Sequence, residues 1–326
     1  MNRPTIAAPT SLLTAMRYFS DHDVCLSFLA GLRWPDGVTC PRCGSDKNSF
    51  LSTRRIWKCK GCQKQFSAKL GTIFEDSPIG LDKWFPAIWL LINAKNGISS
   101  YELGRALGVT QKTAWFMLHR IRLAMQTKTF NRFEDDVEVD ETYIGGLARF
   151  MHKGDRKKAN QSAALRSKTA VMGLLERHGH DPLDKGASQV RVSVVPTSRR
   201  KHLFPNIAAN VETGAKVFTD AHPSYRGLDE RYVHQVIDHA ECYAKGKVHT
   251  NGLENFWSLL KRGIKGTYVN VEPFHLFRYL DEECFRFNNR RMTDAQRFAH
   301  AAASIIGKRL TYKELIGAHL SESHAS

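Results

Sequence analysis

The stretch VEVDETYIGG, residues 137–146, predicts a β-strand because Val137 and Val139 alternate with Glu138 and Asp140 before a pair of glycines. Similar strand patterns follow later in the chain, at residues 169–178, 188–196, 215–221 and 232–238. Helical patterns lie between and after these strands, at residues 197–211, 251–264 and 273–290. Strands that alternate with helices in this order predict an α/β domain with a mixed sheet.

Three carboxylates stand where such a sheet would bring them together. Asp140 lies in the first strand, Asp220 at the end of the fourth, and Glu254 in the first turn of a later helix. Carboxylate oxygens are hard ligands that suit Mg²⁺. Two such ions about 3.5–4 Å apart hold the attacking and leaving oxygens of a phosphoryl displacement. We therefore expect Asp140, Asp220 and Glu254 to bind two Mg²⁺ or Mn²⁺ ions and to be catalytic.

The first two acids have other interpretations. Glu138 or Glu141 could replace Asp140, but Glu138 comes earlier in the strand and Glu141 should face the opposite side of the sheet. Asp220 could serve only to start the turn that follows it.

The third acid has a competing structural role. Asn251 and Glu254 have the spacing of a capping box, in which Asn251 caps the helix and Glu254 reaches back to it. Against this, Lys261 follows Glu254 by two helical turns and so shares its face. A lysine placed there suits a contact with DNA phosphate beside the metals.

Four cysteines form a metal-binding pattern earlier in the chain. Cys40 and Cys43 lie in CPRC, Cys59 and Cys62 lie in CKGC, and 15 residues separate the two pairs. This spacing is typical of a structural zinc site, in which four thiolates fill the tetrahedral coordination of one Zn²⁺. The residues between the pairs then return as a short hairpin, and the segment is predicted to be a zinc ribbon. Free or redox-active thiols would leave the second pair unexplained.

A pair of short helices follows the cysteines. Residues 81–97 form a helical pattern, and residues 99–126 then predict two helices joined at Gly108, with Ser99 and Thr110 as caps. This is the pattern of a helix-turn-helix, although small helical bundles share it. Gln111, Lys112 and Thr113 occupy the first turn of the second helix, where recognition helices meet base edges.

The charge of the chain indicates a polyanionic partner. The 326 residues carry 48 Lys and Arg against 32 Asp and Glu, a net charge of +16. Residues 145–168 are rich in basic side chains, among which Lys157 and Lys158 are candidates for phosphate contacts. No apolar run is long enough for a membrane span, and seven cysteines fit a reducing compartment better than a disulfide framework. We expect a cytoplasmic, nucleoid-associated protein that does not bind membranes.

Several segments, in the same order, resemble the zinc-ribbon branch of bacterial insertion-sequence transposases. The matching segments are CPRC and CKGC, QFSAKLGTIFEDS, LGVTQKTAWFMLHRIR, VEVDETYIGG, VFTDAHPSY, HTNGLENFWSLLKRGIKGTY and HLFRYLDEECFRFNNR. The resemblance implies an RNase H-like catalytic domain with a DDE triad at Asp140, Asp220 and Glu254. Lys261 then follows the third acid as in the family's signature, and Arg262 and Lys265 are expected to contact phosphate nearby.

The expected organisation has five parts. They are a helical segment at 1–35, a zinc ribbon at 36–76, a helix-turn-helix region at 77–130, the RNase H-like domain at 131–300 and a tail at 301–326. Such a protein is expected to bind the terminal inverted repeats of its element, cut DNA and join the 3′-hydroxyl to target DNA, acting as a homo-oligomer. The alternatives are a DNA-binding regulator with an inactive RNase H-like domain and a nuclease without joining activity.

Overall fold

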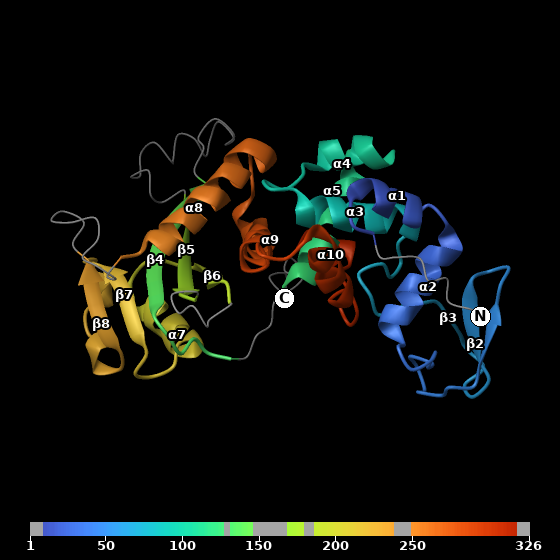
Figure 1. The fold of residues 1–326 in the computed structure, drawn as a ribbon, viewed down its shortest axis with the longest axis horizontal. Helices are drawn as coiled ribbons and strands as arrows, with labels where there is room; N and C mark the ends of the chain where they lie inside the picture. Colours follow the sequence, from blue (N-terminus) through green and yellow to red (C-terminus); the bar gives the residue numbers. More distant parts are fainter. Residues whose placement is uncertain (1–8, 127–130, 146–167, 179–185, 238–248, 318–326) are drawn as a thin grey trace, which may run out of the picture. The chain divides into compact units, whose positions relative to one another are not determined.

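The computed structural model describes residues 9–126, 131–145, 168–178, 186–237 and 249–317. Lys157 and Lys158 lie outside these residues. The chain divides into two compact units, one formed by residues 1–125 with 292–326 and the other by residues 126–291 (Figure 1). Within the described ranges, no helix combines the length and apolar character that a membrane crossing requires.

The first unit combines a small antiparallel sheet with helices. Its sheet has the order β1-β2-β3, with Phe50 opposite Trp57 and Trp57 opposite Phe66. The strands are β1 (Asn48–Leu51), β2 (Ile56–Cys59) and β3 (Gln65–Phe66), and the helices are α1 (Leu12–Tyr18), α2 (His22–Arg33), α3 (Leu81–Asn93), α4 (Ser100–Leu107), α5 (Gln111–Met125), α10 (Asp294–Ala303) and α11 (Tyr312–Leu315).

Local hydrogen bonds set the ends of the α4 and α5 pair. The Ser99 hydroxyl accepts the Glu102 N–H at 3.1 Å, and the Thr110 hydroxyl accepts the Thr113 N–H at 3.2 Å. Gly108 ends α4 in the left-handed conformation, with φ of 60°, which glycine adopts without steric cost. All of these partners lie within four residues of one another, so the sequence alone predicts this helix pair.

The second unit is a five-stranded mixed sheet of order β6-β5-β4-β7-β8. Its first three strands in the chain are antiparallel neighbours, and the last two extend the sheet in parallel from β4. The elements are β4 (Val137–Gly145), β5 (Lys168–Glu176), β6 (Gln189–Val195), α7 (Arg200–Asn210), β7 (Lys216–Asp220), β8 (Val233–Ile237), α8 (Asn251–Gly263) and α9 (Leu276–Asn288). This confirms the predicted α/β fold and agrees with an RNase H-like domain.

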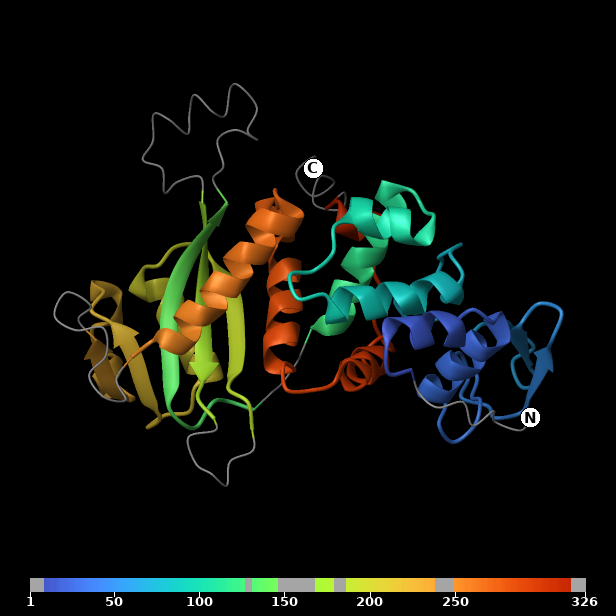
Figure 2. The ribbon, with the colours of Figure 1, turned by 45° about the horizontal axis from the view of Figure 1, so that its top comes forward.

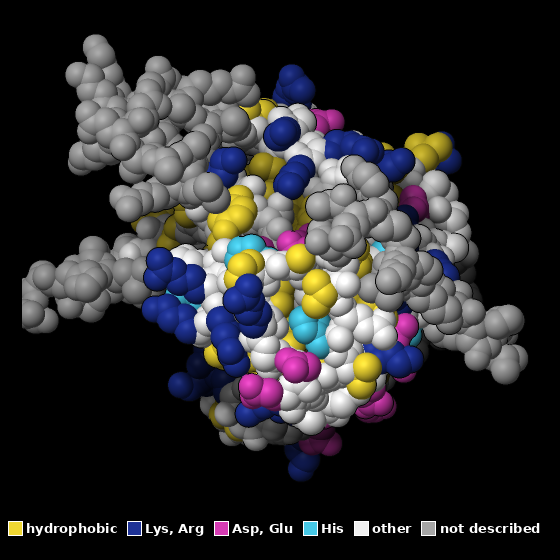
Figure 3. All heavy atoms as spheres, turned by 90° about the vertical axis from the view of Figure 1, so that its left-hand side faces the viewer, with side chains coloured by type: hydrophobic (Ala, Val, Ile, Leu, Met, Phe, Trp, Pro, Cys, Tyr) yellow, Lys and Arg dark blue, Asp and Glu magenta, His cyan; other side chains and the backbone are white. Residues whose placement is uncertain are grey.

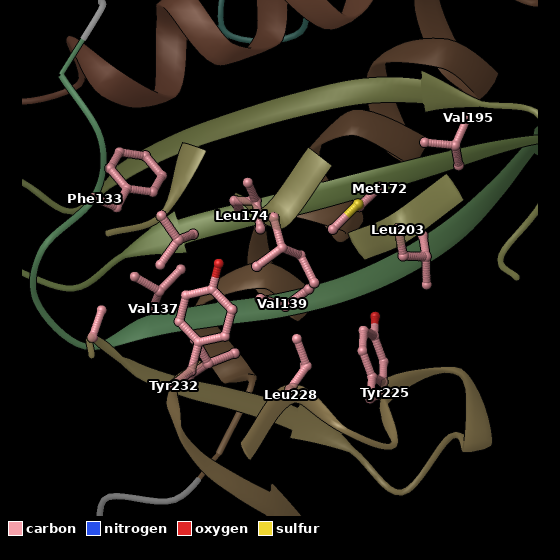
Figure 4. Close-up of a cluster of buried hydrophobic side chains, with 14 of the residues drawn as sticks. Phe133, Val137, Val139, Met172, Leu174, Val195, Leu203, Tyr225, Leu228 and Tyr232 are labelled. Atoms are coloured by element: carbon pink, nitrogen blue, oxygen red, sulfur yellow. The ribbon is translucent and has the colours of Figure 1, made fainter. Parts of the chain in front are cut away.

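Helices cover both faces of this sheet, with α8 and α9 on one face and α7 on the other (Figure 2). Val137 and Val139 face α7 and join a core with Leu203 and Tyr225 (Figure 4). Because side chains alternate along a strand, the residues between and after these valines face α8. Glu138 and Asp140 therefore lie on the α8 face of β4.

One expected boundary differs from the structure. The sequence interpretation placed residues 292–300 with the RNase H-like domain, whereas the second unit ends at Arg291 and α10 belongs to the first unit. α10 packs there against α3, where the Arg297 guanidinium donates to Asn93 Oδ1 at 3.0 Å. Phe298 adds aromatic contacts to Phe85 and Trp89. A helix with one apolar stripe does not show from sequence which core receives it.

Candidate functional site

Parallel pairing of β4 with β7 places two of the expected acids on one face. Val137 pairs with Val217 and Glu138 with Phe218. Continuing this register by two residues aligns Asp140 with Asp220. Register partners on adjacent parallel strands, about 4.8 Å apart, project to the same face. Asp140 and Asp220 therefore share the face that α8 covers.

Asp140 is held by two donors. The indole N–H of Trp257 on α8 donates to Oδ2 at 2.9 Å, and the Glu141 backbone N–H donates to Oδ1 at 2.8 Å. Burial raises the pKa of Asp140, these two hydrogen bonds lower it, and the negative charges of Asp220 and Glu254 raise it again. Asp220 and Glu254 thus each lie within electrostatic range of Asp140, and a cation would relieve this repulsion.

Asp220, the last residue of β7, is half-buried and also starts a turn. Its Oδ1 accepts the backbone N–H of His222 at 3.1 Å. The interpretation that Asp220 starts the following turn is therefore correct, because an aspartate commonly accepts the N–H two residues later. It engages one carboxylate oxygen and leaves the role of the other open.

Glu254 lies exposed in the first turn of α8. The capping box expected from Asn251 is wrong, since Asn251 is already helical and the N-cap residue is Thr250. A Glu254 carboxylate oxygen lies 3.5 Å from the Thr250 hydroxyl. Asn251 is not needed as a cap because Glu138 on β4 supplies an acceptor to this turn. The Leu253 N–H donates to Glu138 Oε2 at 2.8 Å.

The two alternatives to Asp140 have other partners. Glu141 faces the α7 side of the sheet, as expected, where it accepts a hydrogen bond from the Tyr225 hydroxyl. Burial raises the pKa of Glu141 to about 7, against the lowering effect of that hydrogen bond, and the charges of Asp140 and Asp220 add to the rise. Glu138 is buried against Arg177, with 2.7 Å between Oε1 and Nε.

Basic side chains follow the third acid. Lys261 and Arg262 occupy the last turn of α8, and Lys265 lies in the π-helical segment η4 (Ile264–Tyr268). Arg262 and Lys265 are exposed and Lys261 is half-buried. Figure 3 shows Lys and Arg side chains spread over the face that it draws, with Asp and Glu side chains among them.

The first turn of α5 presents two exposed side chains that already have neighbours. Gln111 Nε2 donates to the Ser100 hydroxyl at 2.8 Å, and the Lys112 ammonium lies 5.2 Å from the centre of the Tyr312 ring. Thr113 is half-buried and its hydroxyl lies 2.8 Å from that of Thr110. Lys112 is therefore the exposed cation of this turn.

Four cysteines form the candidate zinc site. Cys40 and Cys62 have their sulfurs 3.7 Å apart, and the sulfurs of Cys43 and Cys59 are 3.5 Å apart. Four thiolates at 2.3 Å from one tetrahedral Zn²⁺ would lie about 3.8 Å from each other. The Cys62 backbone N–H, 3.4 Å from the Cys59 sulfur, helps to lower the pKa of that thiol to about 6. The residues present fit one structural zinc ion.

Among the described residues, these cysteines are the group whose ligand atoms all lie within 4.8 Å of one another. The carboxylate oxygens of Asp140, Asp220 and Glu254 are spread more widely.

Sequence reasoning missed two residues of this site. Trp257 donates to Asp140, and Gly173 on β5 lies directly opposite Asp140 in the sheet. A Cβ at Gly173 would lie 2.6 Å from the Trp257 ring, so a glycine is needed there to admit the indole. A glycine within a strand pattern was the available signal, because it often marks a close approach of another group.

The mixed α/β sheet and the four clustered cysteines agree with a transposase that combines a zinc ribbon with an RNase H-like domain. Residues 132–288 match the ISXO2-like transposase domain, and residues 20–65 match the transposase zinc-ribbon domain. The chain belongs to the ISXO2-like transposase family.

Two similar proteins come from distant organisms. One, described as an uncharacterized protein in transposable element ISH50 of Halobacterium salinarum, is 28% identical over 250 residues, which cover 72% of this chain and 81% of that protein. An uncharacterized transposase-like protein of Haemophilus influenzae is 33% identical over 102 residues, 31% of this chain and 82% of that protein.

Proposed function

We propose that this transposase binds the terminal inverted repeats of its insertion sequence and catalyses metal-dependent strand cleavage and 3′-hydroxyl strand transfer. The observation that carries the proposal is the parallel pairing of β4 with β7, whose register, continued by two residues, aligns Asp140 with Asp220 beneath the helix that carries Glu254. The electrostatic effect of Asp220 and Glu254 on Asp140 supports it, because repelling carboxylates are a typical cation site.

In this proposal Asp140, Asp220 and Glu254 hold two Mg²⁺ or Mn²⁺ ions. When bound, such ions activate a water or a 3′-hydroxyl and neutralise charge on the phosphate. The protein's own contribution is positional: the Trp257 indole and the Glu141 backbone N–H fix the Asp140 carboxylate.

DNA binding is assigned to both units. Lys261, Arg262 and Lys265 supply phosphate contacts near the acids, and Lys157 and Lys158 remain proposed contacts from outside the described residues. Gln111, Lys112 and Thr113 supply base-edge and phosphate contacts from the helix-turn-helix, with the zinc ribbon alongside as the second DNA-binding element. The net charge of +16 supports this assignment. Double-stranded DNA, both the repeats and the target, is therefore the proposed partner.

Two further features belong to the proposal. Two element ends must be held together for transfer, which favours a homo-oligomer in the complex with DNA. A protein that acts on chromosomal and element DNA is proposed to work in the cytoplasm, at the nucleoid.

The test uses the zinc-loaded full-length chain, linear DNA with the element's ends, supercoiled target DNA and Mg²⁺ or Mn²⁺. Asp220→Asn is compared with wild type and with Glu230→Gln, which neutralises an exposed acid of the same unit. We expect Asp220→Asn to lose cleavage and joining while it retains DNA binding, and Glu230→Gln to keep all three.

Each other outcome identifies a different function. Wild-type protein that binds the ends but never cuts them would support a regulator instead. Cleavage without insertion of the 3′-hydroxyl end would support a nuclease without joining activity. Equal activity of wild type and Asp220→Asn would remove Asp220 from the site.

A further inference from the structure

Helix α8, which carries Glu254, begins without a side-chain cap of its own. Thr250 is the N-cap residue, and its side chain makes no capping hydrogen bond. The first N–H groups of a helix have no partner within the helix, so a buried helix start needs acceptors from elsewhere. The side of this start that packs on the sheet is of this kind, since Leu253 is fully buried.

Glu138 on β4 supplies that acceptor. Its side chain is 1% exposed, and its Oε2 accepts the Leu253 N–H at 2.8 Å. Gly252 makes room for this approach, because a Cβ there would lie 2.9 Å from Oε2 and 3.0 Å from Oε1. A carboxylate at a helix amino terminus also interacts favourably with the helix dipole.

Arg177, just past the end of β5, joins Glu138 to the other parts of the site. Its Nε donates to Glu138 Oε1 at 2.7 Å, and its Nη2 donates to the backbone carbonyl of His249, which immediately precedes the N-cap residue of α8. The guanidinium also lies 4.3 Å from the ring centre of Phe218 on β7, two residues before Asp220. The Glu138–Arg177 pair therefore contacts both β4 and β7, which carry the aspartates, and the start of α8, which carries Glu254.

We propose that Glu138, whose buried charge Arg177 balances, is a positioning residue that fixes the start of α8, and hence Glu254, relative to Asp140 and Asp220. The inference rests on the proposed function, because it takes Glu254 to be a metal ligand. Glu138, two residues before Asp140, thus acts through the helix rather than as a ligand. The buried ion pair alone would only stabilise the fold, so the test must separate the cap from the ion pair.

Two double variants make that separation. Glu138→Gln with Arg177→Met removes both charges but keeps a side-chain oxygen that can accept the Leu253 N–H. Glu138→Met with Arg177→Met removes the charges and the acceptor at similar volume. Glu283→Gln is the control for general destabilisation, since it breaks the 2.5 Å ion pair with Arg286 on α9.

Each zinc-loaded full-length protein is examined in two ways. Hydrogen exchange measures protection of the amides of residues 252–255, and electron paramagnetic resonance measures the dissociation constant for Mn²⁺. With the methionine double variant we expect exchange about tenfold faster and a Mn²⁺ dissociation constant about tenfold higher, as for loss of a helix cap. The glutamine double variant should stay within about threefold of wild type in both, and Glu283→Gln should lower only the melting temperature.

Other results overturn the inference. Equal exchange and equal Mn²⁺ affinity in the two double variants would show that the side-chain oxygen at position 138 has no positioning role. A raised Mn²⁺ dissociation constant in Glu283→Gln would attribute the effect to general destabilisation. If wild type and Asp220→Asn bind Mn²⁺ alike, the proposed function fails, and the exchange rates alone then decide whether Glu138 caps α8.

Discussion

Replacing Gly173 by alanine should displace Trp257 from Asp140. Gly173 lies opposite Asp140 in the β4–β5 ladder, so its added Cβ would point to the α8 face. That Cβ would lie 2.6 and 2.8 Å from two carbons of the Trp257 ring and 2.9 Å from Leu253 Cδ2. Carbon atoms prefer separations of about 3.5–4.0 Å, so the ring must move by about 1 Å.

The magnitude follows from these contacts. Overpacking of this kind costs about 1–3 kcal/mol, offset by about 0.4–1 kcal/mol because alanine restricts the unfolded chain more than glycine does. A net loss of about 1–2 kcal/mol should lower the melting temperature of a unit of this size by roughly 2–8 °C. A 1 Å shift also lengthens the 2.9 Å Trp257–Asp140 hydrogen bond beyond bonding range. Under the proposed function, misplacement of the Asp140 carboxylate on this scale is expected to slow cleavage about 100-fold.

The assay measures the melting temperature and the single-turnover cleavage rate of the full-length protein with Mg²⁺. Gly31→Ala is the control, because a Cβ at Gly31 on α2 meets no atom within 4 Å. Trp257→Phe tests the hydrogen bond, because it removes the donor and also relieves the crowding. It should slow cleavage by itself. Adding it to Gly173→Ala should not slow cleavage further. Wild-type melting and cleavage by Gly173→Ala would refute the argument that this glycine positions Trp257.

Four further outcomes are expected. Cys59→Ser should lose the single zinc ion and the structure of the β1–β3 sheet, measured by metal analysis and circular dichroism. Arg120→Met leaves two buried backbone carbonyls and one half-buried carbonyl without their donor and should cost about 3 kcal/mol of unfolding free energy in urea titrations. Lys112→Ala should weaken binding to all DNA sequences and reduce the salt slope by about 1, measured by fluorescence anisotropy. Burial lowers the pKa of His234, whose ring contacts Thr219 at 2.8 Å, so the native state resists the proton that the unfolded chain takes up. Stability should therefore fall as the pH drops below about 6.5, and His234→Gln should lessen this loss in melting scans.

Features that depend on neighbours in the chain can be predicted from the sequence. The spacing of the four cysteines predicted that they form one cluster, because each CxxC turn places two thiolates side by side. The structure brings their sulfurs together. The ends of α4 and α5 followed from Ser99, Gly108 and Thr110, whose partners lie within four residues. Alternation of apolar residues predicted β4 and showed that Glu141 faces away from Asp140. The metal role of the three acids stays a prediction.

The contacts between residues far apart in the chain became known from the three-dimensional fold. The Asn251 capping box was the reasonable local expectation, but the acceptor for α8 comes from Glu138, 115 positions before Leu253. Gly173 and Trp257 likewise meet through the register of β4 with β5 and the packing of α8 on both. Local sequence patterns can predict hydrogen bonds between residues a few positions apart. Partners across a sheet depend on strand order and register, which the burial of the whole domain selects.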